Sequence, residues 1–259
     1  MLSIGQFITP EKALVCTLTS NGYKFLTLNL VRLLQKAHVP WKLCIVCTDK
    51  ASYRFFRQES IPCVLMDSTL PDSQPKITPF GCRAFQQLNL KKLELLAELC
   101  GASEVDYIVY MDGDIAVYAD FLPDLVQRLA VESAPPILLQ CDEQTRTDCS
   151  GSPCPNACTG FVAWRRVDVP AALFQVAGQA SLWRQCPEDQ VFVNQRLREL
   201  AIPFQTLPRD KYPNGMFVRL YGKDAPQKGV TTLLLHYNWR VGETKRQSMM
   251  ANGDWIIPY

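Results

Sequence analysis

The first half of the sequence alternates short apolar segments with longer amphipathic ones. Segments rich in β-branched residues or cysteine predict strands at 13–19, 42–48, 63–66 and from 107 onward. Between them, apolar residues recur at helical spacing over 23–37 and 83–100, and Gly101 follows where a helix end is expected. Strands that alternate with helices form βαβ units, so we expect an α/β fold with a Rossmann-like mixed, mostly parallel sheet flanked by helices.

The second half is less regular. Segments 136–140 and 160–164 predict strands, 190–200 predicts a helix, and 141–158, rich in Ser, Pro, Asp and Thr, predicts a loop. The sequence has no internal repeat, low-complexity tract or obvious linker. We therefore expect one domain over 1–259.

The composition excludes few classes of protein. A hydrophobic share of 47%, a charged share of 20% and a net charge of +2 are ordinary for a globular protein, and nothing in the sequence supports binding of nucleic acid. The N-terminal segment lacks the features of a signal peptide, and no stretch approaches the roughly 20 apolar residues of a transmembrane helix. Several of the eleven cysteines lie in predicted strands, as small apolar residues would, so we expect a reduced, cytoplasmic protein.

Two carboxylates follow the strand that begins at Tyr107. Asp112 and Asp114 are separated only by Gly113, so at a strand end their side chains point the same way. Such a pair repels itself unless a cation lies between, and hard oxygen ligands favour Mg²⁺ or Mn²⁺, which in turn hold phosphate oxygens. The motif predicts a metal–diphosphate site, although Asp-Gly also occurs in ordinary turns after strands.

Three further segments follow in the chain: Glu188–Asn194, Tyr212–Gly215 and His236–Trp255. They are similar to an Asp-Gln…Asn helix start, a Phe-Pro-Asn-Gly segment and a C-terminal His…Gly…Lys…Trp signature. With Asp-x-Asp, they resemble the GT-A-fold nucleotide-diphospho-sugar transferases, in particular the family 77-like glycosyltransferases related to the glycogenin-like family 8. The resemblance implies a nucleotide-sugar-binding half over about 1–118 and an acceptor half over about 119–259, which carries the C-terminal metal and phosphate segment.

The resemblance also implies roles for single residues. It makes Asp112, Asp114 and His236 the metal ligands, and a mixed carboxylate and imidazole set suits Mn²⁺, with Mg²⁺ as the alternative. It makes Asp189, Gln190 and Lys245 the catalytic residues. It assigns donor binding to Thr19, Asn21, Tyr23, Lys92, Asp112, Gly113, Gly242 and Lys245. The sequence leaves simpler alternatives open, such as a core histidine at 236, a snorkelling lysine at 92 and helix capping at 189.

The implied function is a metal-dependent glycosyltransferase that moves a sugar from a nucleoside-diphosphate sugar, by resemblance UDP-bound, with retention of anomeric configuration. The acceptor, whether glycan, protein or small molecule, is unknown. Two other classes remain: a haloacid-dehalogenase-like phosphatase with Asp112 as nucleophile, and a module that binds nucleotide sugar or glycan without turnover. A further cluster is open to a zinc or a free-thiol interpretation, although its spacing fits no standard zinc knuckles: Cys141, Cys149, Cys154 and Cys158.

Overall fold

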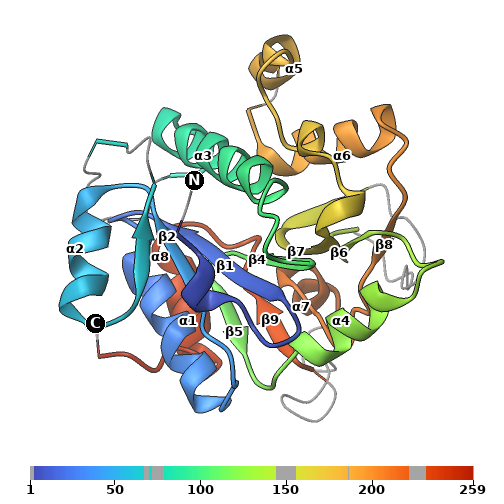
Figure 1. Ribbon diagram of the computed structural model, residues 1–259. Helices are drawn as coiled ribbons and strands as arrows, with labels where there is room; N and C mark the ends of the chain where they lie inside the picture. Colours follow the sequence, from blue (N-terminus) through green and yellow to red (C-terminus); the bar gives the residue numbers. More distant parts are fainter. Residues whose placement is uncertain are drawn as a thin grey trace.

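A central sheet with helices on both faces forms the body of the molecule (Figure 1). The computed structural model describes residues 3–66, 70, 71, 77, 79–143, 156–185, 187–221 and 232–258. The main sheet has seven strands in the order β3-β2-β1-β4-β7-β6-β8. They are β1 (Ala13–Thr19), β2 (Cys44–Cys47), β3 (Cys63–Leu65), β4 (Tyr107–Met111), β6 (Ile137–Cys141), β7 (Ala157–Arg165) and β8 (Phe204–Thr206). Every neighbouring pair is parallel except those that involve β7.

A second, two-stranded sheet lies outside the main one. Its strands are β5 (Ile115–Val117) and β9 (Leu234–His236), which pair antiparallel. The helices are α1 (Lys24–Lys36), α2 (Lys50–Gln58), α3 (Arg83–Leu99), α4 (Leu122–Ala130), α5 (Ala180–Gln185), α6 (Asp189–Glu199), α7 (Gly215–Tyr221) and α8 (Glu243–Ala251). Short 3₁₀ turns lie at Gly5–Phe7, Arg166–Asp168 and Ala171–Leu173.

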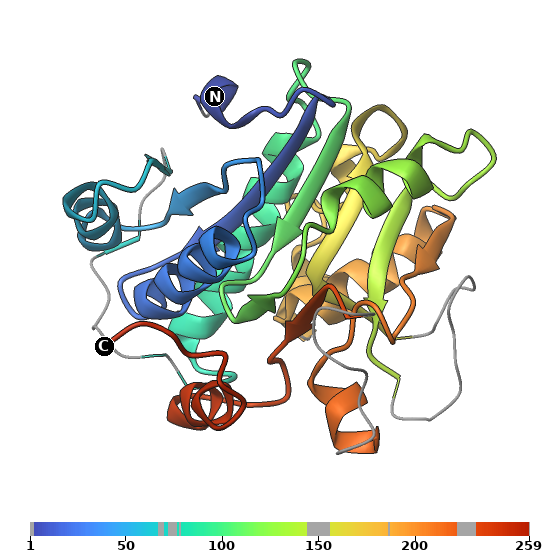
Figure 2. The same ribbon diagram turned by 90° about the horizontal axis from the view of Figure 1, so that it is seen from below.

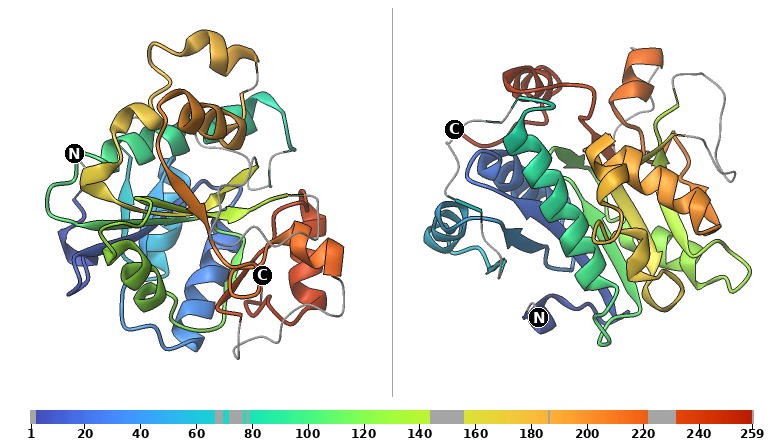
Figure 3. Two further views of the ribbon diagram at one scale, coloured as in Figure 1. Left: turned by 90° about the vertical axis from the view of Figure 1, so that its right-hand side faces the viewer. Right: turned by 90° about the horizontal axis from the view of Figure 1, so that it is seen from above.

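The main sheet separates the hydrophobic core into two layers, each covered by helices. Figure 3 (left) shows α3 and α6 on one face of the sheet and α1 and α4 on the other, and Figure 2 shows the α1 and α4 face from below. On the first face Leu96 of α3 and Phe192 of α6 pack with Trp164 of β7. On the other, Leu28 of α1 packs in one core with Leu125 of α4. Because both faces are covered, every residue of β1 is buried, which explains why apolar residues predominate in it.

The fold class predicted from the sequence is confirmed. The predicted strands and helices of the first half are present, with ends shifted by one or two residues. The loop predicted for 141–158 is wrong at its ends: Cys141 belongs to β6, and Ala157 and Cys158 belong to β7. There a register shift after Leu139 lets the two strands stay paired beyond the predicted boundary, and residues 144–155 lie outside the described residues.

The cysteines of the predicted strands behave as apolar residues. Cys16, Cys44, Cys47 and Cys63 are buried and free, and burial raises the pKa of the Cys44 thiol to about 12. In the further cysteine cluster, Cys141 is disulfide-bonded, which argues against its binding zinc. Cys158 is free and buried, and Cys149 and Cys154 lie outside the described residues.

Among the described helices, none combines the length and the apolar character that crossing a bilayer requires.

Candidate functional site

A cavity lies at the edge of the sheet where the parallel strands end. β1 and β4 end at this edge, and β7, which runs the opposite way, begins there. The cavity has a volume of about 550 Å³ and is lined from β4, β7, β9, α3 and the first turns of α6 and α8. Ligands of open α/β sheets bind beyond the carboxyl ends of the strands, so the topology makes this cavity the candidate site.

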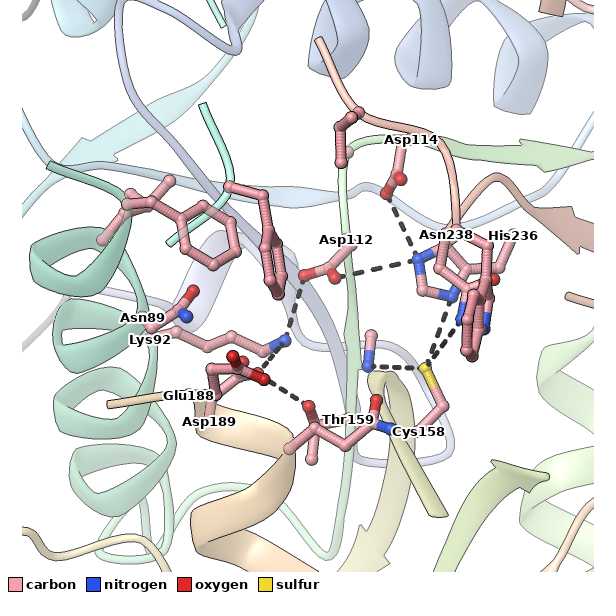
Figure 4. A pocket seen from close by; sticks show the side chains of 18 of the residues that line it. Asn89, Lys92, Asp112, Asp114, Cys158, Thr159, Glu188, Asp189, His236 and Asn238 are labelled. Carbon is pink, nitrogen blue, oxygen red and sulfur yellow. Dashed lines mark hydrogen bonds and ion pairs between the residues drawn. The ribbon is translucent and has the colours of Figure 1, made fainter. Parts of the chain in front are cut away.

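The three predicted metal ligands converge in the cavity wall (Figure 4). Asp112 directly follows β4, Asp114 directly precedes β5, and the pairing of Ile115 with His236 brings the imidazole beside the Asp-Gly-Asp turn. One donor atom from each of the three ligands lies within 4.8 Å of the other two. His236 Nε2 lies 3.3 Å from Asp114 Oδ1 and 3.8 Å from Asp112 Oδ2. Two carboxylates and one imidazole around a common centre can hold a divalent ion such as Mn²⁺.

Two glycines keep this cluster open. A Cβ atom on Gly160 would lie 2.0 Å from Cε1 of His236 and 2.7 Å from Oδ2 of Asp112. The space between these two ligands therefore exists only because residue 160 has no side chain. On the far side of the turn, a Cβ on Gly113 would lie 2.6 Å from Thr27 Oγ1, so Gly113 lets the turn approach α1.

Gln140, fully buried in β6, orients the histidine. Its Nε2 donates to the backbone carbonyls of Tyr212 and Pro213 at 3.1 and 3.2 Å, which places Oε1 3.0 Å from Nδ1 of His236. Because a carboxamide oxygen only accepts hydrogen bonds, the His236 Nδ1 must carry the proton. In the neutral ring Nε2 then presents its lone pair to Asp112 and Asp114, as a metal ligand requires.

Lys92 bridges two of the acids. Its Nζ lies 3.2 Å from Asp112 Oδ1 and 2.7 Å from Asp189 Oδ2 (Figure 4). Burial alone would lower the pKa of Lys92, but Asp112 and Asp189 outweigh burial and raise it. Burial would raise the pKa of Asp189, but Lys92, the Thr159 hydroxyl and the backbone N–H of Gln190 together lower it, so Asp189 is held ionised. Lys92 therefore does not extend to solvent as a snorkelling lysine would. It forms a buried ion-pair bridge beside the cavity, and its contact with the donor stays a prediction.

Lys245 contacts the other acid of the pair. Its Nζ lies 2.5 Å from Oδ2 of Asp114, and Gly242, with φ of 57°, precedes the first turn of α8 in the same cavity wall. Burial would raise the pKa of Asp114, but Lys245 and His236 lower it. Burial would lower the pKa of His236, but Asp114 and Cys158 raise it to about 10. The raised pKa of His236 reflects the negative charge beside its ring, and such charge also attracts a metal cation.

Asp189 and Gln190 both line the cavity at the start of α6. Thr159 Oγ1 donates to Asp189 Oδ2 at 2.6 Å. Gln190 Nε2 donates to Oδ1 of Asn156 and Oδ2 of Asp142, at 2.8 and 3.1 Å. The N-cap residue Glu188 makes no side-chain cap, and the side chains of Asp189 and Gln190 bond to groups in and beside the cavity wall.

Three residues at or just after the end of β1 were predicted to bind the donor, and only one of them lines the cavity. Tyr23 does so, whereas Thr19 is fully buried behind the wall, where its hydroxyl accepts from Thr27 Oγ1 at 3.0 Å. Asn21 is not a cavity residue, and its backbone N–H donates to Asp49 Oδ2 at 2.8 Å. Asp49 itself caps α2, so its carboxylate links the chain after β1 to the start of α2.

Asp142 is a cavity residue that the sequence analysis did not single out. It follows β6 as Asp112 follows β4, which is a signal that could have identified it. Its Oδ1 accepts from the side chains of Asn214, Asn238 and Trp239 at 2.7, 3.0 and 2.8 Å. The carboxylate is buried, and these neutral donors hold it in place.

The Tyr212–Gly215 segment, noted for its resemblance, supports the floor of the cavity. Asn214 Nδ2 also donates to the backbone carbonyl of Cys141, and its Oδ1 accepts from the backbone N–H of Phe217 in α7. A Cβ on Gly215 would lie 2.1 Å from the backbone oxygen of Asn238. The Asn-Gly pair therefore joins the end of β6 to the chain that leaves β9.

Known structures share this fold. The galactosyltransferase LgtC, solved with donor and acceptor sugar analogs, superposes with a TM-score of 0.55 at 10% identity over 94% of this chain and 97% of that one. Mouse xyloside xylosyltransferase 1 in its apo form gives 0.54 at 12% identity over 86% and 97%. A glycosyltransferase involved in glycosylation of the major capsid of PBCV-1 gives 0.53 at 9% identity over 92% and 98%. At these identities the likeness shows the fold.

The sequence profile of the nucleotide-diphospho-sugar transferase family matches residues 41–249, and no curated protein matches the chain significantly. The matched range spans most of the chain and includes the acidic pair, the start of α6, His236 and Lys245. The phosphatase alternative is therefore wrong. The chain belongs to the nucleotide-diphospho-sugar transferases and is a GT-A-fold glycosyltransferase.

Proposed function

We propose that this enzyme transfers a sugar from a UDP-sugar to an acceptor hydroxyl, depends on a divalent metal ion and retains the anomeric configuration. The observation that carries the proposal is the convergence of Asp112, Asp114 and His236 in one wall of a cavity that also presents Asp189 and Lys245. UDP and retention rest on the family to which the chain belongs.

The residues present fit a divalent ion. The ligand set combines hard oxygens with one imidazole nitrogen, and Gly160 leaves the space between ligands that a side chain would fill. A bound Mn²⁺ or Mg²⁺ would supply Lewis-acid neutralisation of the donor's diphosphate. Asp112, Asp114 and the Nε2 atom of His236 would hold such an ion.

The diphosphate is proposed to lie against the first turn of α8. Gly242 presents backbone there without a side chain, and a helix N-terminus favours anions. Lys245, one turn into the helix, lies beside Asp114 and can offer its ammonium group to the leaving phosphate. The charge that develops on the leaving group would therefore be stabilised from the protein side.

The sugar is proposed to lie between the metal site and α6. Asp189 is ionised, so it stabilises positive charge at the anomeric carbon and does not donate a proton. Gln190 uses its amide nitrogen within the protein, which leaves Oε1 for a sugar hydroxyl. Lys92 holds Asp189 and Asp112 at a fixed separation and supplies positive charge near the donor.

The nucleobase is proposed to lie near Tyr23, whose ring can stack on uracil. Thr19 and Asn21 would act indirectly, because they shape the chain before α1. In this arrangement the first half of the chain, to about residue 118, binds the donor, and the second half adds the acceptor side and the metal and phosphate segment. The buried free cysteines favour a cytoplasmic location and the disulfide of Cys141 opposes it, so this location stays a prediction.

Donor turnover tests the proposal. The full chain would be incubated with UDP-glucose, UDP-galactose, UDP-xylose and GDP-mannose, with Mn²⁺ or with a chelator, and released nucleoside diphosphate would be measured. We expect UDP release from a UDP-sugar only with the ion. Asp189→Asn should slow release about 100-fold, whereas the exposed control Asp106→Asn should not. Release that is independent of the ion, or release of GDP alone, would contradict the proposal.

A further inference from the structure

The turn after β9 presents a partly exposed tryptophan at the mouth of the cavity. Trp239 is 41% exposed, and its φ of 61° lies in the left-handed region that bulky residues rarely adopt. A residue keeps such a backbone only where its surroundings hold it, and such outliers gather at functional sites. The contacts that hold Trp239 therefore bear on its role.

The indole is anchored by its edge. Its Nε1 donates to Asp142 Oδ1 at 2.8 Å, and the same oxygen accepts from the side chains of Asn214 and Asn238. Asp142 is 4% exposed and also accepts from Gln190. The ring is thus fixed through a buried carboxylate, although much of its surface faces solvent. A fixed aromatic surface loses little conformational freedom when a ligand packs on it.

Two hollows meet at this ring. Trp239, Arg240 and Val241 line both the main cavity and a second, more open hollow of about 380 Å³. The remaining lining of the second hollow comes from α8: Thr244, Gln247, Ser248 and Ala251. We name this second hollow the Trp239 groove. Its lining combines one aromatic ring with hydroxyl, amide and guanidinium groups and contains no acidic side chain.

We propose that the Trp239 groove is the acceptor subsite and that it binds a sugar residue of the acceptor. A pyranose ring has an apolar C–H face and a rim of hydroxyl groups, which match the indole and the polar side chains of α8. An extended peptide would seek backbone partners at a sheet edge, and a helix face offers none. The proposal deepens the proposed function and rests on it.

The position of the groove suits the reaction. An acceptor sugar on Trp239 borders the cavity in which the donor is proposed to lie. One of its hydroxyl oxygens forms the new bond to the anomeric carbon as the bond from that carbon to the diphosphate oxygen breaks. The hydroxyl proton passes to the leaving diphosphate, so no further reactant is needed.

Saturation-transfer NMR on the full chain with UDP and Mg²⁺ tests the assignment. The probes are the methyl glycosides of glucose, galactose, mannose and xylose, together with a blocked serine tripeptide. We expect saturation of ring protons in at least one glycoside with the wild-type protein. Trp239→Asn, which suits a left-handed backbone and removes the ring, should weaken that binding about tenfold or more, whereas Trp239→Phe, which keeps an aromatic ring but loses the bond to Asp142, should weaken it less. Val131→Ala, an exposed apolar residue after α4, is the control.

Circular dichroism and thermal melting would show that Trp239→Asn folds. Binding of no glycoside, equal binding by wild type and Trp239→Asn, or Trp239-dependent binding of the tripeptide instead would each overturn the inference. Thermal stabilisation of the wild-type protein by UDP with Mg²⁺ distinguishes a failure of the proposed function from a failure of the acceptor subsite alone. If that stabilisation is absent the proposed function fails, and if it is present without glycoside binding only the acceptor subsite fails.

Discussion

The missing side chain at residue 160 decides how close His236 and Asp112 can come to a shared ligand. Gly160→Ala would place a methyl group 2.0 Å from Cε1 of His236, so the imidazole must move. We expect Mn²⁺ affinity, measured by calorimetry, to fall about 10- to 100-fold, as for other changes that displace a metal ligand. Gly5→Ala, where an added Cβ meets no atom within 4 Å, is the matched control. Unchanged affinity in Gly160→Ala would remove His236 from the metal site.

Gln140 contacts the other ring nitrogen of His236, so a substitution of Gln140 tests the same metal ligand. Gln140→Leu removes the acceptor that holds the Nδ1 proton of His236, while the side chain keeps a similar size. We predict about a tenfold or larger loss of Mn²⁺ affinity with the fold retained. In the Co²⁺-loaded protein, the shifted proton resonance of the imidazole N–H should exchange faster with solvent. The exposed Gln58→Leu should change neither property, and a Gln140→Leu protein identical to wild type would show that Gln140 does not orient the ring.

At the level of the helices, α4 is tied to the segment before α7 through one carboxylate. Asp124 accepts from Tyr212 Oη at 2.7 Å and from Lys211 Nζ at 3.0 Å, and it pairs with Arg128 in its own helix. Burial would raise the pKa of Asp124, but Arg128, Tyr212 and Lys211 lower it from 3.8 to about 2. The folded state therefore favours the ionised form, and this contribution to stability is complete above about pH 4 and is lost as the pH falls towards 2.

Asp124→Asn should lower the free energy of unfolding at pH 7 by about 1–2 kcal/mol, because two charged side chains, Arg128 and Lys211, donate to the carboxylate. The difference from wild type should shrink between pH 4 and pH 3. Urea denaturation at pH 7, 4 and 3 measures it, with the exposed Glu132→Gln as the control. An equal difference at pH 7 and pH 3 would mean that the carboxylate charge contributes nothing.

The short strands β5 and β9 show where sequence patterns fail at this level. Apolar residues lie on both sides of the Asp-Gly-Asp motif between Tyr107 and Tyr118, but the chain turns at Gly113 and the residues after it join another sheet. That turn brings Asp114 to His236 through the pairing of Ile115 with His236. The carboxylate pair could be predicted from its spacing, but the place of His236 in the cluster could be anticipated only by resemblance, because the strand pairing that brings it there joins residues far apart in the chain.

Across the whole molecule, the sequence predicts the sheet and its helices because βαβ units are local patterns. It also predicts most residues of the site, since Asp112, Asp114, Asp189 and Lys245 stand in recognisable segments. Gln140 and Asp142 were missed because their partners are remote: the bond from Trp239 to Asp142 spans 97 residues and that from Asn214 spans 72. Thr19 and Asn21, at and just after the end of β1, were expected in the donor site by resemblance. Neither lines the cavity, because the Thr19 hydroxyl bonds to Thr27 and the Asn21 backbone N–H bonds to Asp49, and their donor roles stay a prediction.

The proposed function depends on a UDP site that requires a metal ion, and thermal-shift measurements test for such a site. UDP, GDP, CDP and dTDP would each be added to the full chain with and without Mn²⁺, alongside the Asp114→Asn variant. We expect UDP to raise the melting temperature only when Mn²⁺ is present, and Asp114→Asn to fold but to lose this response. Stabilisation by UDP that does not need Mn²⁺, or an equal response of Asp114→Asn, would contradict this expectation.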